Sequence, residues 1–206
     1  ELEEMAFVMH LLRPGDLFVD VGANIGSYSV MASAGVGARS VAIEPVPATF
    51  ERMLRNARIN ALEDRMTCIQ AGVSDAPGTL AFTAGLDTVN HVLAEGEAGD
   101  CVQVEVLALD SLPAAHEAAI IKIDVEGHEL AVLEGATTVL ASPGLLAVVM
   151  EVNGSGARYG LADDALLACM AGHGFSRYAY DPFARRLKAP QADAANAIFV
   201  RNVEAV

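Results

Sequence analysis

The segment from Asp20 to Gly26, which reads Asp-Val-Gly-Ala-Asn-Ile-Gly, constrains this chain more than any other. It follows an apolar run at Leu17–Val19 that is typical of a buried strand, and a helical pattern begins directly after it. The glycines permit a tight turn and a close approach of the backbone to a ligand, and the helix start offers unpaired N–H groups. An acid before the turn favours a ligand with a positive or polar end. The segment therefore predicts a strand–turn–helix unit that binds a nucleotide-like cofactor.

Composition limits the class of protein. The chain has 206 residues, of which 53% are hydrophobic and 19% charged, so we expect one ordered domain over residues 1–206. Its formal charge of −14 repels phosphate backbones and anionic lipids, which argues against nucleic acid and membrane partners. No apolar run has the length of a membrane span, and Glu1–Glu4 lacks the basic start of a signal peptide. The three cysteines have no metal-binding spacing, and reduced thiols indicate a cytoplasmic protein.

Strands and helices alternate along most of the chain. An N-terminal helix over residues 1–14 comes first. Apolar periodicity then predicts strands at 17–21, 40–44, 66–73, 119–124 and 145–152, with helices at 25–34, 48–60, 129–140 and 161–172. Two final strands at 175–180 and 195–200, joined by a short loop that contains proline, predict an antiparallel hairpin. The pattern is that of a doubly wound α/β sheet with a C-terminal antiparallel strand.

Two segments depart from this alternation. Short strands at 79–83 and 101–107, the second antiparallel or at an edge, flank a polar stretch at 84–100. Long irregular segments in compact domains are often functional, so residues 84–100 form a candidate lid or substrate loop, from which His91 could reach a substrate. The basic cluster Arg185–Lys188 is interpreted as a solvated turn, with a contact site as the less favoured alternative.

Polar side chains follow five of the predicted strands at their carboxyl ends. In a doubly wound sheet the ligand lies beyond these ends, near the point where the strand order reverses. Solvated strand ends would give part of this pattern by chance, but five in register favour a site. The residues are Asp20, Glu44, Ser74 with Asp75, Asp124 with Glu126, and Glu151 with Asn153.

Glu44 indicates which kind of nucleotide is bound. It lies eighteen residues after Gly26, where a carboxylate can accept both ribose hydroxyls of an adenosine group; the alternative is a solvated acid before Pro45. A dinucleotide would use such an acid too, but the turn lacks the Gly-x-Gly-x-x-Gly spacing, and Asp20 would repel a pyrophosphate. A sulfonium cofactor with an ammonium group tolerates Asp20, so charge favours that cofactor.

Several motifs occur together and in order. They are Phe18–Gly26 (FVDVGANIG), Ala42–Pro45 (AIEP), Gly72–Asp75 (GVSD), Ile121–Glu129 (IKIDVEGHE) and Leu133–Ala136 (LEGA). This set resembles the FkbM family of S-adenosylmethionine-dependent methyltransferases, from about Leu17 to Asn153 and more weakly to Val200. The resemblance implies a Rossmann-like, class I methyltransferase sheet with S-adenosyl-L-methionine as cofactor.

The resemblance also implies roles for matching residues. The turn residues would surround the methionine portion of the cofactor, Asn24 by contacting its carboxylate or by shaping the turn. The other implied contacts are the ribose and the adenine edge. The cofactor-binding residues implied in this way are Asp20, Gly22, Asn24, Gly26 and Asp124, with Glu44 for ribose and Ser74 or Asp75 for adenine. Asn153 departs from the family pattern, which often has histidine after this strand, so a base at that position is in doubt.

Methyl transfer is an in-line displacement and depends mainly on alignment, with a base near the acceptor's proton. Asp124, Glu126 and His128 alternate along an extended segment and would project to one side, so they are the candidate catalytic residues. His128, with an ordinary pKa of roughly 6.5, can serve as the base. The competing interpretations are that Asp124 caps a helix, Glu126 binds backbone amides and His128 is a surface residue.

Asp124, Glu126, His128 and Glu151 together also resemble the ligand set of a hard cation such as magnesium or manganese. Their spacing matches no recognised metal signature, so we expect no metal.

The leading hypothesis is an O-methyltransferase acting on a hydroxyl of a sugar or natural product, hence a small-molecule acceptor. One alternative is an N-methyltransferase on a peptide side chain, and another is a nucleotide-binding module without catalysis. The N-terminal helix and the final hairpin are candidate surfaces for a homodimer.

Overall fold

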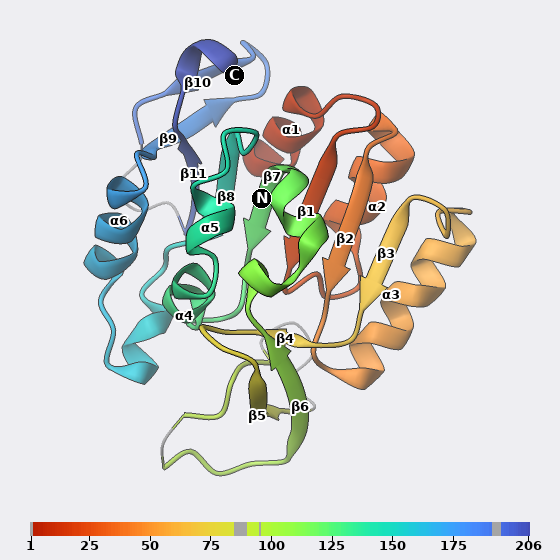
Figure 1. Cartoon of the computed structure of the whole chain (residues 1–206), viewed down its shortest axis with the longest axis vertical. Helices are drawn as coiled ribbons and strands as arrows, with labels where there is room; N and C mark the ends of the chain where they lie inside the picture. The colour runs from red at the N-terminus through yellow and green to blue at the C-terminus, as the bar shows by residue number, and fades with distance from the viewer. Residues whose placement is uncertain (1, 85–89, 95, 191–194) are drawn as a thin grey trace.

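The main sheet has eight strands in the order β10-β9-β11-β8-β7-β1-β2-β3 (Figure 1). The computed structural model describes residues 2–84, 90–94, 96–190 and 195–206. Five strands run parallel: β1 (Leu17–Val21), β2 (Arg39–Ile43), β3 (Met66–Ile69), β7 (Ala118–Ile123) and β8 (Ala147–Glu151). The C-terminal strands β9 (Ser176–Asp181), β10 (Arg186–Lys188) and β11 (Asn196–Val200) pair antiparallel, and β11 lies between β8 and β9.

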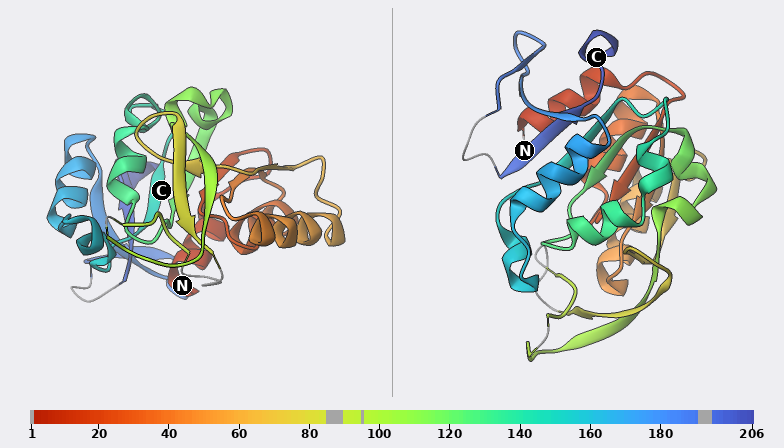
Figure 2. Two further views of the ribbon diagram at one scale, coloured as in Figure 1. Left: turned by 90° about the horizontal axis from the view of Figure 1, so that it is seen from below. Right: turned by 60° about the vertical axis from the view of Figure 1, so that its left-hand side comes forward.

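Helices cover both faces of this sheet (Figures 1 and 2). Because side chains alternate along a strand, neighbouring residues of β1 enter different cores: Phe18 packs with Phe7 of α1, and Val19 with Val132 of α4. The helices are α1 (Leu2–Leu11), α2 (Ser27–Val30), α3 (Pro47–Ile59), α4 (Glu129–Glu134), α5 (Thr137–Leu140) and α6 (Asp163–Gly172). The predicted doubly wound α/β fold with an antiparallel C-terminal strand is confirmed, and the strand order reverses between β1 and β7.

A second, three-stranded sheet extends from the carboxyl-end edge of the main sheet (Figure 1). It contains β4 (Gly72–Val73), β6 (Cys101–Leu107) and β5 (Gly78–Thr83), and the expected antiparallel pairing of 79–83 with 101–107 is confirmed. The prediction of one strand over 66–73 is wrong. The chain leaves the main sheet after Ile69 and enters the second sheet at Gly72. Gly72 lies so close to β5 that a Cβ there would be 2.7 Å from the Phe82 ring.

The predicted helix over 129–140 is two helices. Gly135 separates α4 from α5, and a Cβ on Gly135 would lie 2.1 Å from the carbonyl oxygen of Ser74. The backbone N–H of Asp110 donates to the Gly135 carbonyl at 2.9 Å. The break therefore lets the turn after α4 pack directly on the backbone that follows β4.

Two other local predictions need correction. The helix over 25–34 begins as α2 and then widens into a π-helix, Met31–Val36. The basic cluster Arg185–Lys188 is not only a turn, because Arg186–Lys188 forms β10 at the edge of the sheet, paired with β9. Strands β9 and β11 pair antiparallel as expected, but no short loop joins them, because β10 lies between them in the chain and forms its own hairpin with β9. Among the described residues, no helix combines the length and apolar character needed to cross a bilayer.

Candidate active site

The turn after β1 takes a backbone conformation that only glycine adopts easily. Gly22 and Gly26 have φ values of 74° and 82°, and Asn24, between them, has a φ of 51°. The N–H groups of Gly22 and Ala23 both donate to the carbonyl of Ile43 at 3.0 Å, which ties the turn to β2. A Cβ on Gly22 would lie 1.8 Å from the carbonyl oxygen of Asp124, so the turn packs directly against the end of β7.

Glu44 joins this turn to the end of β2. Its Oε2 accepts a hydrogen bond from the backbone N–H of Asn24 at 3.0 Å, and its Oε1 accepts one from Val46 at 2.9 Å. The side chain is buried, and desolvation raises the pKa of Glu44 to about 7 despite these two N–H donors. Each carboxylate oxygen has a second lone pair, which can accept a further hydrogen bond from a ligand.

A cavity of about 350 Å³ lies at the carboxyl ends of β1, β2, β7 and β8. Its position at the reversal of strand order is where ligands bind in doubly wound sheets. Six of the predicted site residues line it: Gly22, Asn24, Glu44, Asp124, Glu126 and Glu151. Five further residues, to which the sequence motifs give no role, also line the cavity: Met5, Tyr28, Phe82, Asn90 and Lys122.

Asp20 and Gly26 support this cavity without lining it. The carboxyl group of Asp20 is fully buried and accepts a hydrogen bond from the Ser29 hydroxyl at 2.7 Å. Burial raises the pKa of Asp20, and the charge of Lys122 opposes that shift. Within the described part of the chain, Oδ1 of Asp20 has no hydrogen-bond partner. Gly26 caps α2, and a Cβ there would lie 3.0 Å from the side chains of Met53 and Met66.

Ser74, Asp75 and His128 form a separate group beside the cavity. The Ser74 hydroxyl donates to Oδ1 of Asp75 at 2.9 Å and lies 3.0 Å from Nε2 of His128. Since the hydroxyl has one proton, the Nε2–H tautomer of His128 completes the chain of hydrogen bonds. Burial lowers the pKa of His128. His128 also lines a small apolar cleft next to the main cavity, together with Pro45, Gly72 and Phe82.

Three carboxyl groups meet on the other side of the cavity. Oxygen atoms of Asp124, Glu126 and Glu151 all lie within 4.8 Å of one another. Nζ of Lys122 contacts Oδ2 of Asp124 at 2.9 Å and lies 4.9 Å from the centre of the Tyr28 ring. Three oxygen donors suit a hard cation, but His128 lies apart from them and an ammonium group already pairs with Asp124, so we propose no metal.

Glu151 is the least satisfied of these acids. Its Oε2 is buried, and no hydrogen-bond partner for it lies in the described ranges. Burial raises the pKa of Glu151 to about 8, and the negative charges of Asp124 and Glu126 add to the shift. Burial, with the Asp124 charge second, also raises the pKa of Glu126. The cavity therefore holds carboxyl groups that take up protons near neutral pH.

Glu129 holds the loop that carries these acids. Its Oε1 accepts hydrogen bonds from the N–H groups of Val125 and Gly127, both at 3.1 Å. Between them Glu126 has a φ of 56°, a rare value for a residue with a side chain. A Cβ on Gly127 would lie 2.7 Å from the carbonyl of Ser155. The last residue of the motif Asp-x-Glu-Gly-x-Glu, Glu129, therefore stabilises the loop formed by the residues before it, a role that the sequence motif did not indicate.

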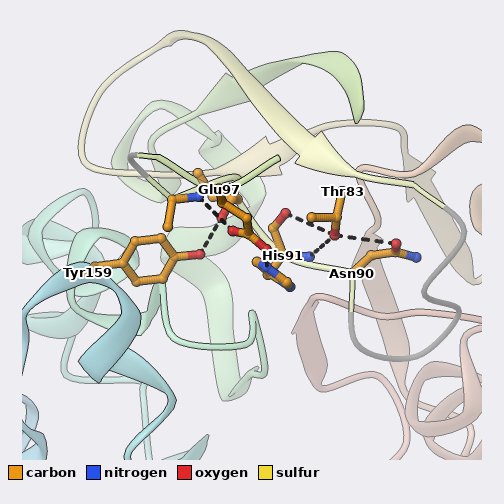
Figure 3. A network of polar contacts seen from close by, with 7 residues as sticks. Thr83, Asn90, His91, Glu97 and Tyr159 are labelled. Atoms are coloured by element: carbon orange, nitrogen blue, oxygen red, sulfur yellow. Dashed lines mark hydrogen bonds and ion pairs between the residues drawn. The ribbon is translucent and has the colours of Figure 1, made fainter. Parts of the chain in front are cut away.

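The predicted lid lies partly outside the described residues, which omit 85–89 and 95. Its described part runs back along β5 and is held by polar contacts (Figure 3). The N–H of His91 donates to Oγ1 of Thr83 at 3.0 Å, and Nε2 of His91 contacts Oε1 of Glu97 at 3.0 Å. His91 is buried here and does not line the main cavity, whereas Asn90 and Phe82 do.

A hydrogen bond joins this segment to the short helix that follows β8. The hydroxyl of Tyr159, at the end of the short helix η5 (Ser155–Tyr159), donates to the carbonyl of Val92 at 2.6 Å (Figure 3). We expect Tyr159→Phe to raise the amide exchange rate of Leu93 about 10-fold and to lower the free energy of unfolding by about 1 kcal/mol, because the Val92 carbonyl loses its partner. Tyr178→Phe on β9 is the matched control. Unchanged exchange at Leu93 in Tyr159→Phe would contradict this role.

Comparison with known proteins decides the family. The profile of the methyltransferase FkbM domain matches residues 20–177. The chain belongs to the FkbM methyltransferase family. This confirms the resemblance carried by the sequence motifs, and S-adenosyl-L-methionine is the cofactor of this family.

Two curated relatives have stated acceptors. The hexuronic acid methyltransferase AglP of Haloferax volcanii is 30% identical over 156 residues, which are 74% of this chain and 62% of AglP. The 31-O-demethyl-FK506 methyltransferase FkbM of Streptomyces tacrolimicus is 29% identical over 200 residues, covering 80% of this chain and 74% of that protein. The chain thus spans less than two thirds of the length of AglP.

Solved structures agree with the fold. A Streptococcus pneumoniae protein assigned as a tRNA (m1A22) methyltransferase, solved with S-adenosyl-L-methionine, has a TM-score of 0.57 at 13% identity and covers 97% of this chain and 72% of its own. Precorrin-6y C5,15-methyltransferase from Geobacter metallireducens has a TM-score of 0.54 at 13% identity, with coverages of 97% and 86%. At this level of identity the likeness shows the fold alone.

Proposed function

We propose that this chain transfers a methyl group from S-adenosyl-L-methionine to a hydroxyl group of a sugar or natural product. One observation carries the proposal. The same cavity is lined by the turn at Gly22–Asn24 with Glu44, and by the carboxyl groups of Asp124, Glu126 and Glu151. A nucleoside-binding wall and a proton-accepting wall therefore face the same space. FkbM acts on 31-O-demethyl-FK506, which supports an oxygen acceptor, and the hexuronic acid of AglP supports a sugar.

The residues present fit this cofactor. Glu44 lines the cavity with free lone pairs for the two ribose hydroxyls. Gly22 lines it with backbone atoms alone, and the absence of a Cβ lets the turn close against Asp124. The apolar cleft lined by Pro45, Phe82 and His128 adjoins the cavity but has a volume of only about 10 Å³, so adenine would enter it only if the Phe82 side chain moved aside. Ser74 and Asp75, which join His128 by hydrogen bonds, would then lie at its edge. The cofactor supplies an electrophilic methyl group on a positively charged sulfur. Asn24 and the carboxyl groups of the cavity offer partners for its charged end.

The chain's own contribution to the reaction is alignment and acceptance of a proton. Asp124 is held by Lys122 at 2.9 Å, which suits an orienting role more than a base. Glu126 and Glu151 line the cavity, and their pKa values are raised, that of Glu151 to about 8, so each carboxylate once ionised is a stronger proton acceptor than an ordinary glutamate. His128, the third candidate from the sequence, lies off the cavity beside Ser74, which favours a role in the adenine cleft.

A pH profile tests the base. As an ionised acceptor, Glu151 would give a rate that rises with pH through about 8, since only the carboxylate can take the hydroxyl proton. We expect Glu151→Gln to lose about 100-fold in kcat and to remove that rise, while S-adenosylhomocysteine binding stays within about 3-fold of the wild type. Glu126→Gln is the matched comparison. If Glu151→Gln keeps both the rate and the pH profile and Glu126→Gln does not, Glu126 is the base.

The function itself is tested by binding and transfer with methyl-labelled cofactor. We expect S-adenosylmethionine binding by calorimetry and label transfer to at least one acceptor in a panel of glycosides and hydroxylated natural products. Label on a peptide amine instead would select the N-methyltransferase alternative. Cofactor binding with no transfer to any acceptor would select the non-catalytic module. Binding of NADH without S-adenosylmethionine would overturn the assignment.

A further inference from the structure

A second cavity, of about 460 Å³, lies away from the candidate active site. It is a groove between α1, the β9–β10 hairpin and the C-terminal turn η6 (Val203–Ala205). Figure 1 places this end of the molecule at the top and the β4-β6-β5 sheet at the bottom. We call it the basic groove and define it by Phe7, Leu11, Arg185, Arg186, Leu187 and Val203. Its volume lies in the range of small-molecule sites, which run from roughly 300 to 1,000 Å³.

The groove is lined by basic residues, whereas the protein as a whole is acidic. The chain has 27 acidic and 13 basic residues, yet Arg13, Arg185 and Arg186 all line this one groove. Arg13 donates from Nη1 to the carbonyls of His10, Leu11 and Leu12 and so caps α1. Among the described residues, no hydrogen bond or close ion pair holds the side chains of Arg185 and Arg186, although the charge of Arg186 acts on Asp181 and that of Arg185 on Tyr180. Two guanidinium groups are therefore available to an anion.

The floor and rim of the groove are apolar. Beneath the groove, Phe7 packs edge-on against the ring of Tyr180, with ring centres 5.3 Å apart, and both side chains are buried, as is Leu11. The accessible apolar surface comes from Leu187, Val203 and Val206. Val203 and Val206, which both line the groove, are 49% and 38% exposed. Exposed apolar side chains gathered at one place mark binding surfaces more often than scattered ones do. The groove thus pairs an apolar surface with unpaired positive charge.

We propose that the basic groove binds an anionic amphiphile, a ligand with one carboxylate or phosphate head and an apolar chain. Arg185 and Arg186 would hold the head, and the accessible side chains of Leu187, Val203 and Val206 would cover the chain. A free, monomeric ligand fits better than a membrane surface, because a net charge of −14 opposes the approach of an anionic bilayer. The proposal concerns a second site and does not depend on the methyl transfer proposed above.

The direct test is calorimetry and NMR with dodecyl phosphate kept below its micelle concentration. We expect dodecyl phosphate to bind at least about 10-fold more tightly than inorganic phosphate or decyl maltoside, since each of these lacks one half of the recognised chemistry. Backbone shifts should centre on Leu11, Tyr180 and Leu187. Vesicles of phosphatidylglycerol form the membrane arm and should not retain the protein.

Variants make the test specific. The double change Arg185→Asn with Arg186→Gln removes both charges, and asparagine tolerates the φ of 50° at position 185. We expect about 10-fold weaker binding, against about 3-fold for Val203→Ser and no change for Arg55→Gln on α3. Equal binding of phosphate alone, shifts that map elsewhere, retention on vesicles without binding of the free ligand, or an unaffected double variant would each overturn the proposal.

Discussion

We expect Gly22→Ala to lower the free energy of unfolding by about 3 kcal/mol or more and to weaken S-adenosylmethionine binding at least about 100-fold. The reason is distance. A Cβ at this position would lie 1.8 Å from the carbonyl oxygen and 2.9 Å from the carbonyl carbon of Asp124, and backbone atoms cannot move aside as a flexible side chain can. The end of β7 would have to separate from the turn after β1, and the cavity walls would separate with it.

A matched glycine separates this clash from backbone strain. Gly15 has a φ of 88°, but no atom lies within 4 Å of a Cβ built there. Gly15→Ala therefore carries the conformational cost alone, about 1 kcal/mol, and should leave cofactor affinity unchanged. Chemical denaturation and calorimetry measure both effects. If Gly22→Ala and Gly15→Ala behaved alike in both measurements, the contact between the turn and Asp124 would not matter.

The strand ends were predictable because each follows an apolar run of strand length. Asp20, Glu44, Asp124 and Glu151 all fall at or directly after the carboxyl ends of parallel strands, as the alternation of strands and helices implies. Which of these side chains face the cavity was less predictable. Asp20 and Lys122 are partners across β1 and β7, yet only Lys122 reaches the cavity. Periodicity along one strand does not say how far a neighbouring helix, here α2 with Ser29, covers a side chain.

Loop contacts account for most of the remaining errors. An extended chain from Asp124 to His128 would place three side chains on one side, but Glu126 and Gly127 have positive φ values and turn the chain. His128 therefore lies beside Ser74 and not with the acids. The bend depends on the Glu129 carboxylate and on close contact with Ser155, a residue far along the chain. A contact of that kind leaves no local pattern in the sequence.

The second large effect concerns Glu44. Folding raises its pKa from an ordinary 4.5 to about 7, so between these values the folded state holds a proton that the unfolded state has lost. The free energy of unfolding contributed by Glu44 is thus fully present below about pH 4.5 and declines as the pH rises through about 7, by up to about 3 kcal/mol. Glu151, Glu126, Glu129 and Asp20 have pKa values shifted in the same direction. The cofactor-free protein should therefore be more stable at pH 5 than at pH 8.

Glu44→Gln isolates the share of this one residue. The amide keeps one acceptor for Asn24 or Val46 but turns an N–H donor toward the other backbone N–H, and it cannot ionise. We expect a flatter dependence of stability on pH and at least about 30-fold weaker S-adenosylmethionine binding at pH 8, where the wild-type carboxylate accepts the ribose hydroxyls. Glu51→Gln, exposed on α3, is the control. Denaturation midpoints and calorimetry at pH 5, 6.5 and 8 give both quantities. Parallel pH curves for Glu44→Gln and the wild type would show that Glu44 does not titrate in this range, and unchanged affinity would remove it from the ribose site.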